Sequence, residues 1–504
     1  MTRLLAVFCL LAAGNALAAD AKHYEPTWDS IDSRPTPAWW SDAKFGIFIH
    51  WGVYSVPSFA PKGEYAEWYW ERLGRPGDPD PASKDAAIRR ETRAFHERVY
   101  GKDFPYFDFA PRFRAEMFDA DQWAATFKRS GAKYVVLVSK HHDGFALWPS
   151  QQANETWGRR WNAVDEGPHR DLAGELTTAV RKQHLEMGFY FSLYEWFNPL
   201  WTAKRYDDYV QRHMFPQFKD LVTRYSPSVI FADGEWELPS EQWRAPELLA
   251  WLYNDSPVAD KVVVNDRWGR ETRHQHGGYY TTEYGAGLPG ATHPWEENRG
   301  IGFSYGYNRN ENLDDYATGQ RLLLTLLDTV SRGGNLLLNV GPTADGRIPV
   351  VMQERLAYLG QWLDKNGAAI YGTRTFRDGA QWTAGKRQEV DTSTNYRAKY
   401  DVEQLTMHPA PGDARKEILF TRKGSTLYAI LPVYPRGTLT IRDLKLAKNA
   451  RIGMLGTNLV KIAWQPRGKD IQVSMPALDS LELPFDGAVV LEIEGAAVQQ
   501  DAAP

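Results

Sequence analysis

The stretch Ser228-Val229-Ile230-Phe231-Ala232-Asp233-Gly234-Glu235-Trp236 runs from an apolar segment directly into a carboxylate and a glycine. Valine, isoleucine and phenylalanine favour extended backbone, so we expect a buried strand over Val229–Asp233. Gly234 permits a sharp turn after this strand because it has no Cβ atom. The stretch therefore predicts a strand that delivers Asp233 to the edge of a sheet.

Similar apolar segments recur through the first part of the chain. They are Phe45–His50, Tyr134–Lys140, Gly188–Tyr194, Val262–Asp266 and Asn335–Val340. Longer amphipathic stretches between them predict helices, over Asp121–Ser130, Leu172–Leu185, Tyr206–Tyr225, Asp315–Ser331 and Val351–Lys365. Short strands that alternate with helices predict an α/β domain with a mainly parallel sheet.

Polar side chains close these strands. The strand ends carry His50, Lys140-His141-His142, Glu195, Asp233, Asp266-Arg267 and Asn339. An active site at the carboxyl ends of parallel strands is typical of a (β/α)₈ barrel, although an open doubly wound sheet shows a similar trend. The large domain lacks a G-x-G-x-x-G turn after its first strand, which favours a (β/α)₈-like TIM barrel over residues 20–373.

The hydrophobic pattern of the sequence changes after about Arg374. Short alternating segments appear at Glu417–Thr421, Thr426–Leu431, Gly437–Ile441, Ala450–Gly453, Asp470–Val473 and Gly487–Ile493. Turn-forming residues separate them, which predicts a C-terminal antiparallel β-sandwich over residues 374–495. Residues 496–504 are interpreted as a frayed tail.

The first residues have the pattern of a secretory signal peptide. Arg3 precedes an apolar run from Leu4 to Ala13, and small residues lead up to Ala19. We therefore predict that residues 1–19 are a signal peptide and that the protein is exported, either to the periplasm or to the extracellular medium. Cys9 is the only cysteine and lies in this leader, so we expect no disulfide in the mature chain. No later stretch is apolar enough to span a bilayer, so we expect no membrane partner after signal cleavage.

Composition limits the choice of partner. The net charge of −4 comes without a basic tract, so we expect no nucleic-acid partner. Aromatic residues make up 13% of the chain, which suits a protein that stacks rings against sugars but equally a large aromatic core.

Asp233 and three histidines are candidates for a site. Asp233 could attack a sugar carbon if apolar side chains enclose it. The alternative is a structural role, in which Asp233 caps the N-terminus of the next helix. His141 and His142 are consecutive, so in an extended segment one faces a pocket and the other supports it, while zinc binding is the minority interpretation. His50 beside Trp51 is expected to donate hydrogen bonds to a polar ligand, or else to be a core histidine.

Retaining cleavage of a glycoside needs a second carboxyl group about 5–5.5 Å from the nucleophile. Glu283 lies in Gly278-Tyr279-Tyr280-Thr281-Thr282-Glu283-Tyr284, and Glu296 lies in Pro294-Trp295-Glu296-Glu297-Asn298. The spacing of the sequence does not separate the two. Glu64 and Glu67 are further carboxylates, for which a solvated loop is the simpler interpretation, and Arg267 could bind a hydroxyl or form an ordinary salt bridge.

Together these segments resemble the α-L-fucosidases of glycoside hydrolase family 29. The resemblance rests on Lys44–Gly52, Phe107–Asp121, Gly131–Phe145, Tyr190–Trp196, Ala232–Trp236, Trp251–Gly269 and Gly302–Asn310. It implies a barrel-like catalytic domain with a C-terminal β-sandwich, which hydrolyses terminal α-L-fucosides with net retention. It also implies that Asp233 is the nucleophile.

The resemblance further implies contacts with the sugar. His50, His141, His142 and Arg267 match positions that contact the fucose, and Glu64 matches a polar binding position. Phe231 stands where many relatives carry tryptophan and would form a pocket wall. The implied mechanism needs no cofactor and no metal.

The acid/base residue differs within the family that the sequence resembles. Relatives with a Thr-x-Glu-Tyr stretch use its glutamate, which corresponds to Glu283. An older signature centres on Lys-Trp-Glu-x-Cys, and this chain has lost both the lysine and the cysteine around Glu296. The resemblance therefore favours Glu283, with Glu296 as the alternative.

Two other functions remain open on the sequence. The chain could be a non-hydrolytic glycan-binding protein on the same fold, or a hydrolase for another sugar such as a galactoside. The expected partner is a fucosylated oligosaccharide or glycoconjugate, and the sequence is compatible with a homo-oligomer. The loop around Arg75–Arg98 is predicted to shape the substrate entrance or a subunit contact.

Overall fold

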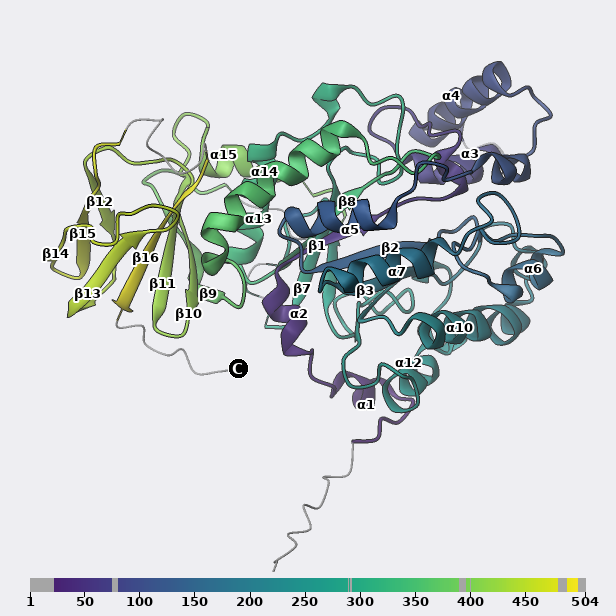
Figure 1. The fold of residues 1–504 in the computed structure, drawn as a ribbon, viewed down its shortest axis with the longest axis horizontal. Helices are drawn as coiled ribbons and strands as arrows, with labels where there is room; N and C mark the ends of the chain where they lie inside the picture. The colour runs from purple at the N-terminus through teal and green to yellow at the C-terminus, as the bar shows by residue number, and fades with distance from the viewer. Residues whose placement is uncertain are drawn as a thin grey trace, which may run out of the picture.

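The computed structural model describes residues 22–74, 80–288, 290, 292–388, 396–398, 400–478 and 487–496. The predicted signal peptide and most of the predicted tail lie outside the described residues. The chain folds into a large α/β part and a smaller all-β part (Figure 1). The buried apolar residues form three clusters, of which two are centred on the α/β part and one on the all-β part. Among the described residues, no helix is both long and apolar enough to cross a membrane.

The first part contains eight parallel strands in barrel order, β5-β4-β3-β2-β1-β8-β7-β6. Their bounds are β1 Phe45–Ile49, β2 Tyr134–Lys140, β3 Glu186–Ser192, β4 Val229–Asp233, β5 Val263–Val264, β6 Tyr280–Glu283, β7 Trp295–Gly300 and β8 Asn335–Val340. Chain-order neighbours pair from β1 to β5 and from β6 to β8, and β8 returns to β1. The predicted TIM-barrel class is confirmed.

The curled sheet is least regular between β5 and β6. Strand β5 has only two residues, fewer than the Val262–Asp266 strand that the sequence predicts. The backbone N–H groups of Gly278 and Tyr279 donate to the carbonyl of Val264 at 3.1 and 3.2 Å. The segment directly before β6 therefore continues the hydrogen bonding across this seam.

Helices surround the sheet (Figure 1). Their bounds are α1 Trp28–Asp32, α2 Ala38–Ala43, α3 Tyr69–Gly74, α4 Lys84–Val99, α5 Ala120–Arg129, α6 Gln151–Trp157, α7 Leu172–Lys182, α8 Pro199–Thr202, α9 Tyr206–Tyr209, α10 Phe215–Tyr225, α11 Ser240–Trp243, α12 Ala245–Asn254, α13 Gly319–Ser331, α14 Val350–Asn366 and α15 Val402–Thr406. Side-chain caps fix several starts: Asp119 accepts from the N–H of Gln122, and Thr318 accepts from that of Arg321.

Two predicted segments fold differently from the expectation. The Arg75–Arg98 segment is not a loop throughout, because α4 occupies most of it, starts at the Ser83 cap and packs on α3. The helix predicted over Tyr206–Tyr225 is interrupted by a π-helical turn over Val210–Met214. That turn carries the buried His213, which has a role beneath the site.

The C-terminal part consists of two antiparallel sheets. The five-stranded sheet has the order β13-β16-β11-β10-β9, and the three-stranded sheet has the order β12-β15-β14. Their bounds are β9 Arg374–Trp382, β10 Lys416–Lys423, β11 Thr426–Leu431, β12 Thr438–Ile441, β13 Leu446–Met454, β14 Trp464–Arg467, β15 Asp470–Ser474 and β16 Val489–Ala496. Apolar residues of both sheets share one core, which confirms the predicted sandwich.

Candidate active site

A pocket of about 290 Å³ opens at the carboxyl ends of the barrel strands. Six of the residues predicted from the sequence line it: His50, His141, Phe231, Asp233, Arg267 and Glu283. They come from five different strands or from the loops that follow them. The structure thus brings together polar groups that are spread over more than 230 positions of sequence.

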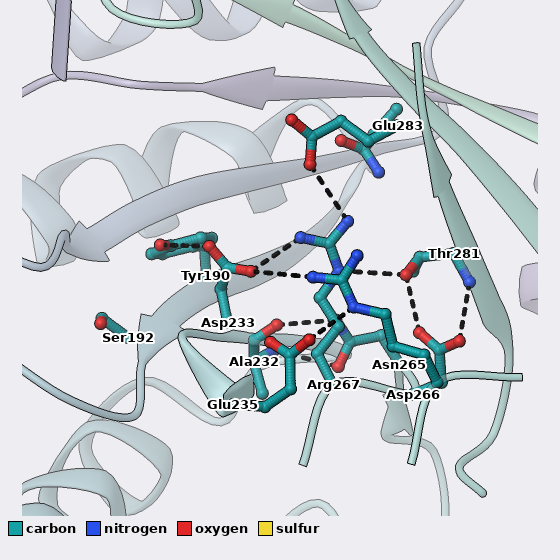
Figure 2. A network of polar contacts seen from close by, with 12 residues as sticks. Tyr190, Ser192, Ala232, Asp233, Glu235, Asn265, Asp266, Arg267, Thr281 and Glu283 are labelled. Atoms are coloured by element: carbon teal, nitrogen blue, oxygen red, sulfur yellow. Dashed lines mark hydrogen bonds and ion pairs between the residues drawn. The ribbon is translucent and has the colours of Figure 1, made fainter. Parts of the chain in front are cut away.

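Asp233 is the last residue of β4 and points into this pocket (Figure 2). Its Oδ2 accepts a hydrogen bond from the Tyr190 hydroxyl at 2.8 Å, and its Oδ1 accepts one from Arg267 Nη1 at 2.7 Å. Burial alone would raise the pKa of Asp233, but Arg267 and then His142 outweigh it and lower that pKa to about 2. The carboxylate is therefore ionised throughout the neutral range.

Gly234 makes the turn after Asp233 possible. Its φ of +79° lies in the left-handed region, where other residues are strained. A Cβ atom at this position would also meet the ring of Tyr194 at 2.5 Å. The glycine turn that the sequence predicts is confirmed, and its requirement is both conformational and steric.

Arg267 joins the two sides of the pocket. While Nη1 binds Asp233, Nη2 donates to Glu283 Oε2 at 3.4 Å (Figure 2). Its Nε donates to the hydroxyl of Thr281 at 3.0 Å, and that hydroxyl donates to Asp266 at 2.7 Å. The guanidinium is thus held at three nitrogens, so both carboxylates have a fixed common neighbour.

Glu283 ends β6, opposite Asn298 of β7. Its side chain is 12% exposed, and Oε1 accepts a hydrogen bond from the Tyr65 hydroxyl at 2.8 Å. Glu283 therefore reaches the same pocket as Asp233 while remaining accessible to a ligand from solvent.

Glu296 lies at the other end of the barrel. It is the second residue of β7, pairs with Asn335 at the start of β8, and is 0% exposed. The Tyr134 hydroxyl donates to its Oε2, and burial raises the pKa of Glu296 to about 8. The structure does not bring Glu296 together with Asp233.

A glycine provides the room around Glu296. A Cβ atom on Gly46 would meet the Tyr134 ring at 2.4 Å, so only glycine lets this ring lie across the barrel interior toward Glu296.

His50 presents an acceptor to the pocket. Its Nδ1 lies 2.7 Å from Asn339 Oδ1, while the amide nitrogen of Asn339 donates to the carbonyl of Tyr305. The Asn339 oxygen must therefore accept, which places the proton on His50 Nδ1. Burial lowers the pKa of His50 to about 3, so the ring is neutral and Nε2 is free to accept. In this tautomer His50 would accept from a ligand, whereas the sequence predicts that it donates.

His141 and His142 divide their roles as predicted. His141 lines the pocket, with its ring parallel to that of Tyr190 at 5.6 Å. His142 lies behind it, with Nε2 at 3.6 Å from Asp233 Oδ2. The Ser192 hydroxyl donates to the carbonyl of Tyr194, so His142 Nδ1 must donate to Ser192. Burial lowers the pKa of His142 to about 4, so this ring too is neutral.

A buried charge cluster supports the two histidines from below. Lys140 Nζ contacts Glu195 Oε1 at 2.6 Å, and His213 Nε2 contacts the same oxygen at 2.6 Å. All three side chains are completely buried. Because Lys140 directly precedes the histidine pair, this cluster fixes the end of β2.

Phe231 forms part of an apolar wall. The rings of Phe231 and Phe48 are 5.0 Å apart, and the Arg267 guanidinium lies 4.9 Å from the Phe231 centroid. An apolar wall beside hydrogen-bonding groups suits a deoxy sugar, which has both a methyl group and hydroxyls.

Glu64 and Glu67 are both buried, at 7% and 2% exposure, so the solvated-loop interpretation is wrong. Glu64 lies outside the pocket and contacts Lys84 at 2.5 Å and Arg72 at 3.3 Å. Glu67 lines the pocket instead, accepts from the N–H of Gly306 at 2.8 Å, and has its pKa raised by burial to about 7.

Sequence reasoning also missed Tyr190, although it lies in one of the stretches that carry the resemblance. Tyr190 is buried like its neighbours in β3, and its contact with Asp233 depends on the pairing of β3 with β4. The described residues contain no group of three or more His, Cys, Asp or Glu side chains placed to hold a metal.

An ionised carboxylate, a second carboxylate and an apolar wall at the top of a parallel barrel define a glycoside hydrolase. A family model described as "Alpha-L-fucosidase" matches residues 11–368, and one described as "Alpha-L-fucosidase C-terminal domain" matches residues 413–494. The chain belongs to the α-L-fucosidase family.

Individual relatives agree with this assignment. The chain is 39% identical to tissue α-L-fucosidase of Homo sapiens, over 98% of this chain and 96% of the relative. It is 45% identical to α-L-fucosidase of Dictyostelium discoideum, over 74% and 79%. The crystal structure of Thermotoga maritima α-fucosidase in complex with fucose is 33% identical, with a TM-score of 0.72 over 94% of this chain and 100% of that one.

Proposed function

We propose that this α-L-fucosidase acts by double displacement with net retention, with Asp233 as nucleophile and Glu283 as acid/base. The observation that carries the proposal is the single Arg267 guanidinium that binds both carboxylates at the pocket. A retaining mechanism needs two carboxyl groups close together, and one shared cation keeps these two within one site.

In the first step, Asp233 attacks the anomeric carbon while Glu283 gives a proton to the leaving oxygen. Asp233 suits the attack because it is ionised and because Tyr190 fixes one of its oxygens. In the second step, Glu283 takes a proton from water, which releases the sugar from Asp233. Glu296 suits neither step because it is fully buried at the far end of the barrel.

The proposed sugar site uses hydrogen-bond acceptors on one side and an apolar wall on the other. Neutral His50 would accept from a sugar hydroxyl, and His141 would contact the sugar beside it, while His142 would support Asp233 from behind the pocket. Phe231 and Phe48 would contact the methyl group. The Thermotoga maritima α-fucosidase, solved with fucose and with a mechanism-based inhibitor, supports the choice of sugar.

The test of the nucleophile is Asp233→Gly. We expect kcat/KM for 4-nitrophenyl α-L-fucoside to fall by at least about 10³-fold, because the attacking carboxylate is removed. Azide should restore turnover and give the β-L-fucosyl azide, since azide then attacks the substrate directly from the opposite face. Near-normal turnover, or an α-azide from this variant, would overturn the assignment.

We also propose that the protein is exported with residues 1–19 removed and acts on fucosylated oligosaccharides or glycoconjugates. The support is the sequence pattern of the leader. Intact-mass analysis of the protein recovered from periplasm and medium tests this. A cytoplasmic protein that retains Met1 would contradict the proposal.

A further inference from the structure

Two aromatic side chains in the molecule are unusually exposed. Trp236 is 37% exposed and Tyr396 is 40% exposed, and no other tryptophan, tyrosine or phenylalanine among the described residues is as open to solvent. Both line the pocket that holds Asp233 and Glu283. Exposed aromatic rings cost free energy when nothing covers them, so their convergence on one pocket indicates a binding surface.

Tyr396 comes from outside the barrel, on the segment between β9 and α15. Its backbone forms a bridge with Glu283, and the next N–H, that of Arg397, donates to the Glu283 carbonyl at 2.9 Å. The Arg397 guanidinium lies 4.7 Å from the ring centroid of Tyr65 and 4.6 Å from that of Phe303. Tyr396 is therefore fixed beside the carboxyl group that would protonate the leaving oxygen.

Trp236 lies three residues after Asp233, in the 3₁₀ turn Glu235–Glu237 that follows β4. Its ring is stacked at 6.3 Å and 19° on that of Trp68 and lies edge-on to that of Tyr194 at 5.8 Å. These neighbours hold Trp236 at the rim, where part of its ring remains open.

The charges around the two rings are largely compensated. Arg273, which also lines the pocket, contacts Glu235 at 2.5 Å, and Arg397 faces Glu64 at 3.9 Å. An uncompensated cation would favour an anionic leaving group. The rim offers instead two aromatic rings and paired charges, which suits a neutral sugar with an apolar C–H face.

We propose that Trp236 and Tyr396 form the subsite for the leaving group, and that this subsite takes a neutral pyranose sugar. The inference rests on the proposed function, because it uses Glu283 to define the side on which the leaving group departs. Tyr396, which lies in the chain between β9 and β10 of the β-sandwich, then becomes a part of the active site. Contacts with the two rings contribute to catalysis only when the leaving group is large enough to reach them.

The test compares two substrates of the full-length protein: α-L-fucosyl fluoride, and the fucosyl disaccharide of galactose or N-acetylglucosamine that the wild type cleaves best. Fluoride is too small to reach either ring. For Tyr396→Ala and Trp236→Ala, the ratio of kcat/KM for the disaccharide to kcat/KM for the fluoride should fall about three- to tenfold. Tyr396→Phe and Trp236→Phe keep a ring and should hold this ratio within about twofold of wild type.

Met117→Ala removes an apolar side chain that is 57% exposed and does not line the pocket, so it serves as the matched control. An unchanged ratio in both alanine variants would overturn the subsite, as would phenylalanine variants that lose as much as the alanine variants. A wild type that hydrolyses neither substrate would defeat the proposed function, whereas an active wild type with unmoved ratios defeats the subsite alone.

Discussion

The two ends of the barrel treat a carboxyl group in opposite ways. At the carboxyl ends of the strands, Asp233 is surrounded by Arg267, Tyr190 and His142, and its pKa is lowered to about 2. At the amino ends, Glu296 has the Tyr134 hydroxyl as a neighbour, and burial raises its pKa to about 8. Both groups are buried, so burial does not decide between a charged and a neutral carboxyl group. The nearby cations decide.

This contrast separates a reactive site from a structural one. The pocket concentrates charge, and each charge has a compensating partner that a ligand can displace or share. The amino end keeps a neutral acid inside an aromatic cluster that includes Tyr134 and Tyr279. The comparison predicts that changes at the first end affect catalysis and that changes at the second affect stability.

The largest effect should come from removing the shared cation. Arg267→Met leaves Asp233 and Glu283 without their common partner, so we expect kcat/KM to fall by about 10²- to 10³-fold. Because Arg267 lowers the pKa of Asp233, its loss should raise that pKa, and the acidic limb of the pH–kcat/KM profile should move to higher pH.

The matched control is Arg273→Met. Arg273 lies 4.0 Å from Asp233 and is bound mainly to Glu235. We therefore expect Arg273→Met to lower kcat/KM less than about tenfold and to shift the acidic limb of the pH–kcat/KM profile less than Arg267→Met does. Equal losses of kcat/KM in the two variants would show that the net charge of the pocket matters and that the contact of Arg267 with both Asp233 and Glu283 does not.

A smaller effect should follow the loss of one hydrogen bond. Tyr190→Phe removes the 2.8 Å bond to Asp233 Oδ2 and should lower kcat/KM about tenfold. Tyr134→Phe removes the corresponding bond to Glu296 and should leave kcat/KM within about twofold. A comparable loss of activity in Tyr134→Phe would break the distinction between the two ends.

The smallest effect concerns stability and pH. Since the folded state raises the pKa of Glu296 above 4.5, its contribution to stability is fully present below that pH and is lost as pH rises through about 8. Glu296→Gln does not titrate. We expect the Tm of the variant to match that of wild type near pH 4.5. Near pH 8 the Tm of the variant should be higher by about a few °C, because only the wild type loses stability as the pH rises.

Calorimetry across that pH range measures the difference. Glu297→Gln is the control, because Glu297 is paired with Arg299 at 2.6 Å and its loss should destabilise the protein near pH 8. A Tm difference for Glu296→Gln that does not depend on pH would contradict the neutral state of Glu296.

Parts of this picture could be predicted from the sequence. Strands β2, β4 and β8 match the predicted bounds, because each is built around a short run of consecutive apolar residues. Strands β6 and β7 are not predicted from the sequence. Strand β7, Trp295–Gly300, is buried although it contains two glutamates and an arginine, so it lacks the apolar pattern of a buried strand. The Tyr134 hydroxyl contacts Glu296, and Arg299 pairs with Glu297. The contact from Tyr134 is distant in sequence.

The site shows the same limit. Asp233 and the histidines could be predicted because they follow apolar strands directly. Glu67 could not be distinguished from Glu64, because the choice depends on a turn of 3₁₀-helix over Ala66–Trp68 that directs one side chain inward. Tyr396 was missed because it reaches the pocket from another part of the chain.

The most direct test of the account is azide rescue of Glu283→Ala and Glu296→Ala on an α-L-fucoside with a good leaving group. In Glu283→Ala, Asp233 still forms the β-linked intermediate, so azide should accelerate turnover and yield α-L-fucosyl azide. Glu296→Ala should show neither acceleration nor azide product. An α-azide produced by Glu296→Ala, with Glu283→Ala unresponsive, would contradict the assignment of the acid/base to the pocket end of the barrel.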